Sequence, residues 1–168
     1  MPNPQVGDFG VVRTGGIAGK LIRFGTRSSV NHAFVLVAHG RIVEAQPGGA
    51  VESDADRYPD AIWSSFDLTD SDRASIAHWG EAQVGVGYGW VDILALSFAV
   101  VITALFGRNR ATRALLRLFA GRIERMDRLI CSQLVDKAYL LAGAHLFDDD
   151  RLPGQVTPGD LLRLIGSR

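Results

Sequence analysis

The chain contains one cysteine, which excludes an intramolecular disulfide and any zinc site built from several cysteines. It also lacks a charge bias, since 18 basic and 18 acidic side chains cancel, so the overall charge gives no support to a nucleic-acid partner. No apolar run reaches the roughly 20 residues of a transmembrane helix, because the longest, residues 91–106, is shorter and contains Asp92. The first residues show no basic stretch followed by an apolar run, so we expect no secretory signal.

What is present fits an ordinary globular protein. A chain of 168 residues with 47% hydrophobic side chains is long enough to bury a core, and we expect one domain over residues 1–168. We expect a cytoplasmic protein that needs no cofactor and no metal. Peripheral membrane contact or association with a phage remains the alternative for its location.

The first half of the chain has the pattern of short strands separated by glycine-rich turns. The nearly continuous apolar run at residues 32–38 predicts a central strand. His39 and Gly40 then form a hairpin turn, so residues 41–45 are expected to return antiparallel. The other expected elements are strands at 9–13 and 50–53 and a short helix at 17–25.

The second half has helical patterns. Thr69 or Asp70 is placed to cap a helix that runs through residues 74–84. Further helices are expected at 91–106, 111–120, 131–142 and 159–165. Strands first and helices later predict an α+β fold, with a small antiparallel sheet and helices packed against it.

Cys131 lies at the beginning of one of these predicted helices, ahead of apolar residues at 134, 135 and 138. Free backbone N–H groups and the helix dipole at such a position favour an anion, which lowers the pKa of a thiol. The same N–H groups are suited to hold the oxyanion of a tetrahedral intermediate. Position alone fits a buried small side chain equally well.

His32 and Glu44 are the candidate partners of this thiol. His32 stands at the start of the predicted central strand, where its imidazole is suited to take and return the proton of a cysteine. Glu44 is on the strand expected to return beside it, where a carboxylate fixes the orientation of an imidazole. A histidine bonded within its loop and a solvated glutamate are the competing interpretations. The other histidines, at 39, 78 and 145, have the surroundings of solvated surface residues.

Tyr88 and Ser132 are the candidate lining of a substrate or oxyanion pocket. Tyr88 lies among glycines 85, 87 and 89, which suggests a tight bend that presents the ring to a pocket. A packed aromatic side chain at a helix junction is the alternative. Ser132 follows the cysteine in the same predicted helical turn.

The order of these motifs resembles the circularly permuted papain-like enzymes of the NlpC-type superfamily, in the branch related to lecithin–retinol acyltransferase. The resemblance rests on segments 7–14, 26–33, 43–45, 87–88 and 130–135, and it covers residues 7 to about 143. In this branch the histidine strand precedes the cysteine helix, as His32 precedes Cys131 here.

The resemblance implies that Cys131 attacks, that His32 transfers the proton and that Glu44 orients the imidazole. It implies a hydrolase that cleaves an amide or peptide bond through an acyl-enzyme, with bacterial cell-wall peptide as the substrate. Relatives also transfer acyl chains, so a lipid-directed acyltransferase or esterase is the alternative. A non-catalytic binding module is the third hypothesis, against which the complete set of three residues argues.

One departure from the family is a helical insertion at about 91–128. It joins the apolar run at 91–106 to a segment at 108–128 that has seven arginines against Glu124 and Asp127. An apolar helix beside a basic one is suited to an anionic membrane or an acyl chain. A helical hairpin packed on the domain with solvated arginines is the other interpretation.

Overall fold

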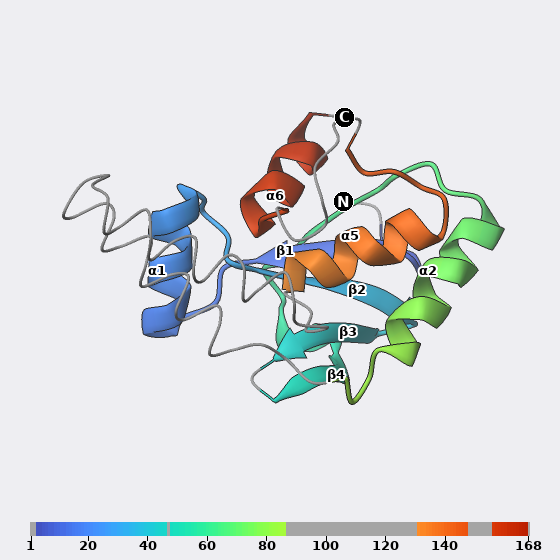
Figure 1. The fold of residues 1–168 in the computed structure, drawn as a ribbon, viewed down its shortest axis with the longest axis horizontal. Coiled ribbons are helices and arrows are strands. Elements are labelled where there is room, and N and C mark those ends of the chain that lie inside the picture. Colours follow the sequence, from blue (N-terminus) through green and yellow to red (C-terminus); the bar gives the residue numbers. More distant parts are fainter. Residues whose placement is uncertain (1–2, 47, 87–130, 148–155, 168) are drawn as a thin grey trace, which may run out of the picture.

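The structure, a computed structural model, describes residues 3–46, 48–86, 131–147 and 156–167. Within these ranges it is an α+β fold with a five-stranded antiparallel sheet of order β4-β3-β2-β1-β5 (Figure 1). The predicted fold class and the central place of the strand at 32–38 are therefore confirmed. The strands are β1 (Phe9–Val12), β2 (His32–Ala38), β3 (Arg41–Gln46), β4 (Gly49–Asp54) and β5 (Ile62–Trp63).

The described helices agree with the sequence patterns to within a few residues. They are α1 (Gly16–Thr26), α2 (Asp70–Ala82), α5 (Cys131–Leu141) and α6 (Pro158–Gly166). The cap of α2 is Thr69, whose side chain accepts from the backbone of Asp72 in a capping box. The predicted helices at 91–106 and 111–120, and the insertion at 91–128 as a whole, lie outside the described residues. None of the helices in the described ranges has the length and hydropathy needed to cross a membrane.

Two short elements have no counterpart in the sequence prediction. The 3-10 helix η1 (Ala55–Arg57) follows β4, and β5 then pairs with the free edge of β1. These elements carry Tyr58 and Trp63, whose rings pack on Phe34 with centroids 5.0 Å and 5.3 Å away. The connection from β4 to α2 therefore covers one face of the sheet.

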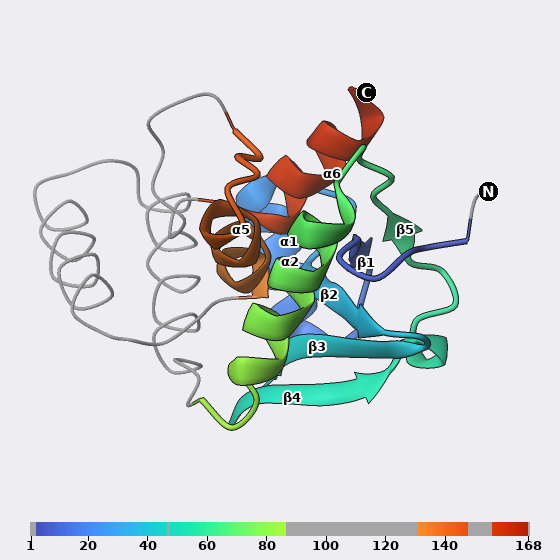
Figure 2. The same ribbon diagram turned by 90° about the vertical axis from the view of Figure 1, so that its right-hand side faces the viewer.

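The two faces of β2 belong to different clusters of buried side chains. Ala33, Val35 and Val37 face the main core, which α2 and α5 cover (Figure 2). Phe34 and Leu36 face the smaller cluster with Tyr58 and Trp63. This alternation is the period of two that a β-strand imposes.

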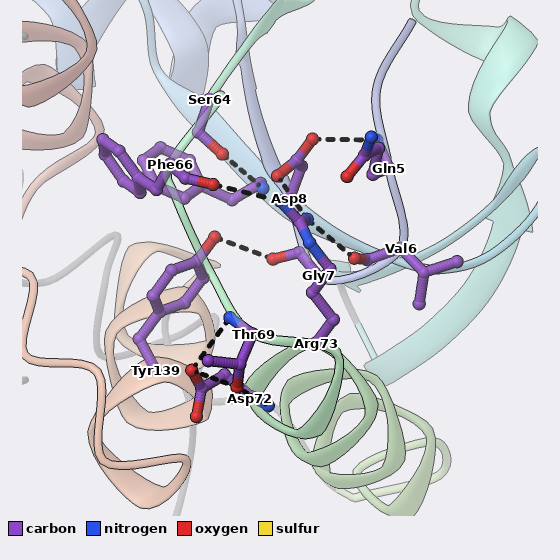
Figure 3. A network of polar contacts seen from close by, with 11 residues as sticks. Gln5, Val6, Gly7, Asp8, Ser64, Phe66, Thr69, Asp72, Arg73 and Tyr139 are labelled. Carbon is purple, nitrogen blue, oxygen red and sulfur yellow. Dashed lines mark hydrogen bonds and ion pairs between the residues drawn. The ribbon is translucent and has the colours of Figure 1, made fainter.

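A polar network joins the beginning of β1 to α2 and α5 (Figure 3). The Arg73 guanidinium donates to the Asp8 carboxylate at 3.0 Å and to the carbonyl oxygens of Val6 and Phe66. The Tyr139 phenol donates to the Gly7 carbonyl at 2.7 Å. These hydrogen bonds satisfy the buried polar groups, and the bond from Tyr139 fixes the C-terminal end of α5 on the sheet.

Candidate active site

Cys131 and His32 come from different layers of the fold. His32 is the first residue of β2, and Cys131 is the first described residue of α5. In Figure 1 the beginning of α5 lies over the beginning of β2, and a hydrogen bond joins the Cys131 thiol to the His32 side chain. Two residues 99 positions apart in the sequence therefore form a thiol–imidazole pair.

The His32 ring also contacts Glu44, which lies on β3 next to β2. The distance from His32 Nε2 to Glu44 Oε2 is 2.7 Å. This contact occupies Nε2, so it leaves Nδ1 for the thiol. The structure thus places the imidazole between a thiol and a carboxylate, which is the arrangement of a nucleophile, a base and an orienting acid.

Glu44 is fully buried, and donors surround its carboxylate. Oε2 accepts from His32 and from the Tyr58 phenol at 2.6 Å, and Oε1 accepts from the Gln46 amide at 2.7 Å. Burial alone would raise the pKa of Glu44, but the hydrogen bonds from His32, Tyr58 and Ser53 lower it to about 2. Glu44 is therefore a charged group, and the expectation of a solvated surface glutamate does not apply.

The pKa values of the two titrating partners, His32 and Cys131, are shifted in opposite directions. Burial lowers the pKa of His32, but the contacts with Cys131 and Glu44 outweigh it and raise that pKa to about 9. For Cys131 burial raises the thiol pKa, whereas the hydrogen bond and charge of His32 lower it, with a further contribution from the backbone of Ala33 and Ser132. The net pKa of Cys131 is lowered. The two shifts therefore favour the thiolate–imidazolium form of the pair over the neutral form.

No protein-family model matches this chain, and no curated protein matches it either. Within the described part of the chain, no three His, Cys, Asp or Glu side chains form a group that could hold a metal ion.

Tyr58 is a site residue that the sequence analysis missed. Its phenol donates to the same Glu44 oxygen that contacts His32, and its ring lies 5.7 Å from the His32 ring. The ring is also stacked on Phe34 at an interplanar angle of 13°. Tyr58 follows a short 3-10 helix with no periodic pattern, so no local signal in the sequence indicates this position.

Of the two predicted pocket residues, Ser132 and Tyr88, the structure describes only Ser132. The Ser132 hydroxyl donates to the Val156 carbonyl at 2.6 Å and the side chain is fully buried, so only its backbone N–H is directed at the Cys131 sulfur. Tyr88 lies outside the described residues. The three other histidines, at 39, 78 and 145, are exposed, as predicted.

The segment before His32 is held by a second polar cluster. The Asn31 side chain accepts from the Thr14 backbone N–H at 3.0 Å and from Arg23 Nη1 at 2.6 Å. The same Arg23 nitrogen donates to the Thr14 carbonyl at 2.8 Å. Because Asn31 directly precedes His32, this cluster fixes the backbone from which the imidazole projects.

Proposed function

We propose that this protein is a cysteine-dependent hydrolase of the permuted papain-like type, which cleaves an amide or peptide bond. The observation that carries the proposal is the His32 ring, which is hydrogen-bonded to Cys131 on one side and to Glu44 on the other. The packing of α5, whose first described residue is Cys131, on the histidine strand supports that fold type. Bacterial cell-wall peptide is the substrate that the family resemblance implies.

The reaction begins when the Cys131 thiolate attacks the carbonyl carbon and forms a C–S bond. The carbonyl electron pair moves to oxygen, and backbone N–H groups beside the sulfur, such as that of Ser132, are suited to stabilise this oxyanion. When the intermediate collapses, the C–N bond breaks and the leaving amine takes the proton of the His32 imidazolium. A thioester on Cys131 remains.

Water completes the cycle. The neutral His32 imidazole takes a proton from the attacking water, and the new C–O bond forms as the C–S bond breaks. The thiolate leaves beside the imidazolium, so the ion pair is restored and an acid is released. Glu44 stays ionised throughout, and it stabilises the imidazolium through Nε2.

Two other functions are less well supported. The lipid-directed acyltransferase or esterase rests on residues 91–128, which lie outside the described part of the chain, so it stays a prediction. A binding module needs no activated thiol. A fully buried carboxylate costs free energy to desolvate even when several donors surround it, and the Glu44 carboxylate serves here to hold an imidazole.

The test uses an activated ester, p-nitrophenyl acetate, and follows the release of nitrophenolate. We expect a burst of about one nitrophenolate per chain, and a mass increase of one acetyl group on Cys131. His32→Ala removes the base, so the rate of the burst is expected to fall about 100-fold or more. The matched control is His78→Ala on the exposed side of α2, which leaves the burst unchanged.

Absence of an acetyl group on Cys131 in the folded wild-type protein would refute the proposal. Equal bursts in wild type and His32→Ala would also refute it, because the thiol would then react without its base. Isolated cell-wall peptides, tested next with wild type and Cys131→Ala, decide the substrate class separately from the mechanism.

A further inference from the structure

Helix α1 turns a polar side toward the rest of the protein. Gly19 is buried, and a Cβ there would lie 2.8 Å from Asn31 Nδ2 and 2.9 Å from the Thr14 carbonyl oxygen. Arg23, one turn further on the same side, bonds to both of these residues. The contacts of Gly19 and Arg23 with the rest of the protein are therefore polar, and they leave no room for a larger side chain at Gly19.

The opposite side of α1 is apolar and faces solvent. Ile17 and Phe24 are 79% and 68% exposed, which makes them the most exposed large hydrophobic side chains of the described residues. They are seven residues apart, so they lie on one face two turns apart. An ordinary surface helix has the reverse arrangement, with its apolar face in the core. In Figure 1 α1 stands to one side of the sheet, near the beginning of β2.

The charged side chains of α1 and of the sequence on either side of it are all basic. Arg13, Lys20 and Arg27 are exposed, and between Asp8 and Glu44 the chain has no acidic residue. Exposed apolar side chains flanked by cations match the interface of an anionic bilayer, where the former enter the headgroup region and the latter contact phosphates. A second copy of α1 is a poorer occupant, because a symmetric contact would bring the same cations together.

We propose that α1 docks on an anionic lipid bilayer through Ile17 and Phe24, with Lys20 and Arg27 beside lipid phosphates. The surface uses neither Cys131 nor Glu44, so the proposal stands independently of the hydrolase activity. Because Arg23 ties α1 to Asn31, docking brings the beginning of β2, and with it His32, close to the membrane surface.

The test is flotation of the full chain with vesicles of phosphatidylcholine, with and without phosphatidylglycerol. We expect wild type to float only with the anionic vesicles and to be released at about 1 M salt, where charges are screened over about 3 Å. Ile17→Ser with Phe24→Ser is expected to weaken binding about tenfold or more, because it removes the apolar area that enters the bilayer. Lys20→Glu is expected to weaken it further.

The matched control is Leu140→Ser with Leu141→Ser on α5, which removes two apolar side chains that are 40% and 65% exposed. This variant is expected to bind as wild type does. Far-UV circular dichroism and Cys131 alkylation at wild-type rate establish that the α1 variant is folded, and Cys131→Ala is expected to float as wild type does. Wild type that stays unbound, or an α1 variant that floats equally well, would overturn the proposal. A concentration-dependent dimer abolished by the α1 substitutions would also overturn it.

Discussion

One oxygen of Glu44 serves two donors, since Oε2 lies 2.7 Å from His32 Nε2 and 2.6 Å from the Tyr58 phenol oxygen. The Glu44 carboxylate thus links Tyr58, whose ring packs on one face of the sheet, to the His32 imidazole, which contacts Cys131 on α5. The orientation of the candidate base depends on this one buried group.

The first prediction concerns the pH dependence of Cys131. Because the thiol pKa is lowered, iodoacetamide is expected to alkylate Cys131 rapidly at pH 6 to 7, where a thiol of ordinary pKa, about 8.5, is mostly protonated. Ester or amide turnover needs the imidazolium as an acid, so kcat/KM is expected to fall as pH rises through about 9. A rate of alkylation that rises only with an apparent pKa near 8.5 would contradict the ion pair.

Glu44→Gln tests the charge of the carboxylate. The amide keeps the size of the side chain but no longer favours the imidazolium, so the pKa of His32 falls and the Cys131 thiolate loses its partner. We expect alkylation at pH 6 to slow by about tenfold or more, the ratio that one unit of pKa gives. Glu52→Gln on β4, where the carboxylate is exposed and bonded to Arg41, is the matched control and leaves the rate unchanged.

The same pair predicts a pH window for stability. The folded pKa of Glu44 is about 2 against an ordinary 4.5, so its contribution is complete above pH 4.5 and is lost as pH falls toward 2. The folded pKa of His32 is about 9 against 6.5, so its contribution is complete below pH 6.5 and is lost as pH rises through 9.

The difference in unfolding free energy between wild type and Glu44→Gln is therefore expected to be largest between pH 4.5 and 6.5. Its size is on the order of 3 kcal/mol or less. Urea unfolding at about pH 3, 5.5 and 9.5 measures it. If this difference in unfolding free energy keeps growing above pH 9, the predicted sign of the His32 contribution is wrong.

Tyr58→Phe removes one hydrogen bond and keeps the ring stacked on Phe34. We expect a loss of about 1 to 2 kcal/mol of stability and a several-fold slower alkylation of Cys131 at pH 6, since Glu44 is held less firmly. Tyr139→Phe is the matched control, because it removes the bond to the Gly7 carbonyl at the other end of α5. It is expected to lower stability by a similar amount without shifting the pH profile of alkylation.

Gly10→Ala tests the packing under the site. A Cβ at Gly10 would overlap Cε2 of Phe34, whose ring is confined by Tyr58 and Trp63. We expect a loss of about 2 kcal/mol or more, as in other overpacked cores. Gly166→Ala, where nothing lies within 4 Å, is expected to change stability by less than about 0.5 kcal/mol. Similar midpoints in urea for the two variants would contradict this packing.

Local patterns were sufficient to predict most of the described elements. The apolar run of β2, the turn after it and the cap at Thr69 are each contained in a few consecutive residues. The same patterns made Cys131, His32 and Glu44 candidate site residues. Only the order of the motifs along the chain indicated that the three belong to one site. The helix that begins with Cys131 and the antiparallel strand that contains Glu44 lie where their local patterns predict them.

What the sequence did not indicate depends on contacts between distant segments. Tyr58 meets Glu44 only because the chain returns over the sheet through η1, and it stands in no periodic pattern. The two-residue strand β5 is too short to produce an alternation. The bond between Asp8 and Arg73 joins residues 65 positions apart, and no local rule pairs them.

Cys131 and His32 lie in two different layers of the fold, so their contact has to form after both segments have been synthesised. During synthesis the whole sheet, including His32 and Glu44, precedes the cysteine. Until α5 settles against β2, the thiol has no imidazole beside it and behaves as any free cysteine does. The lowered pKa of the Cys131 thiol is thus a property of the completed fold, and a chain in which α5 has not yet packed on β2 lacks the activated thiol that we propose.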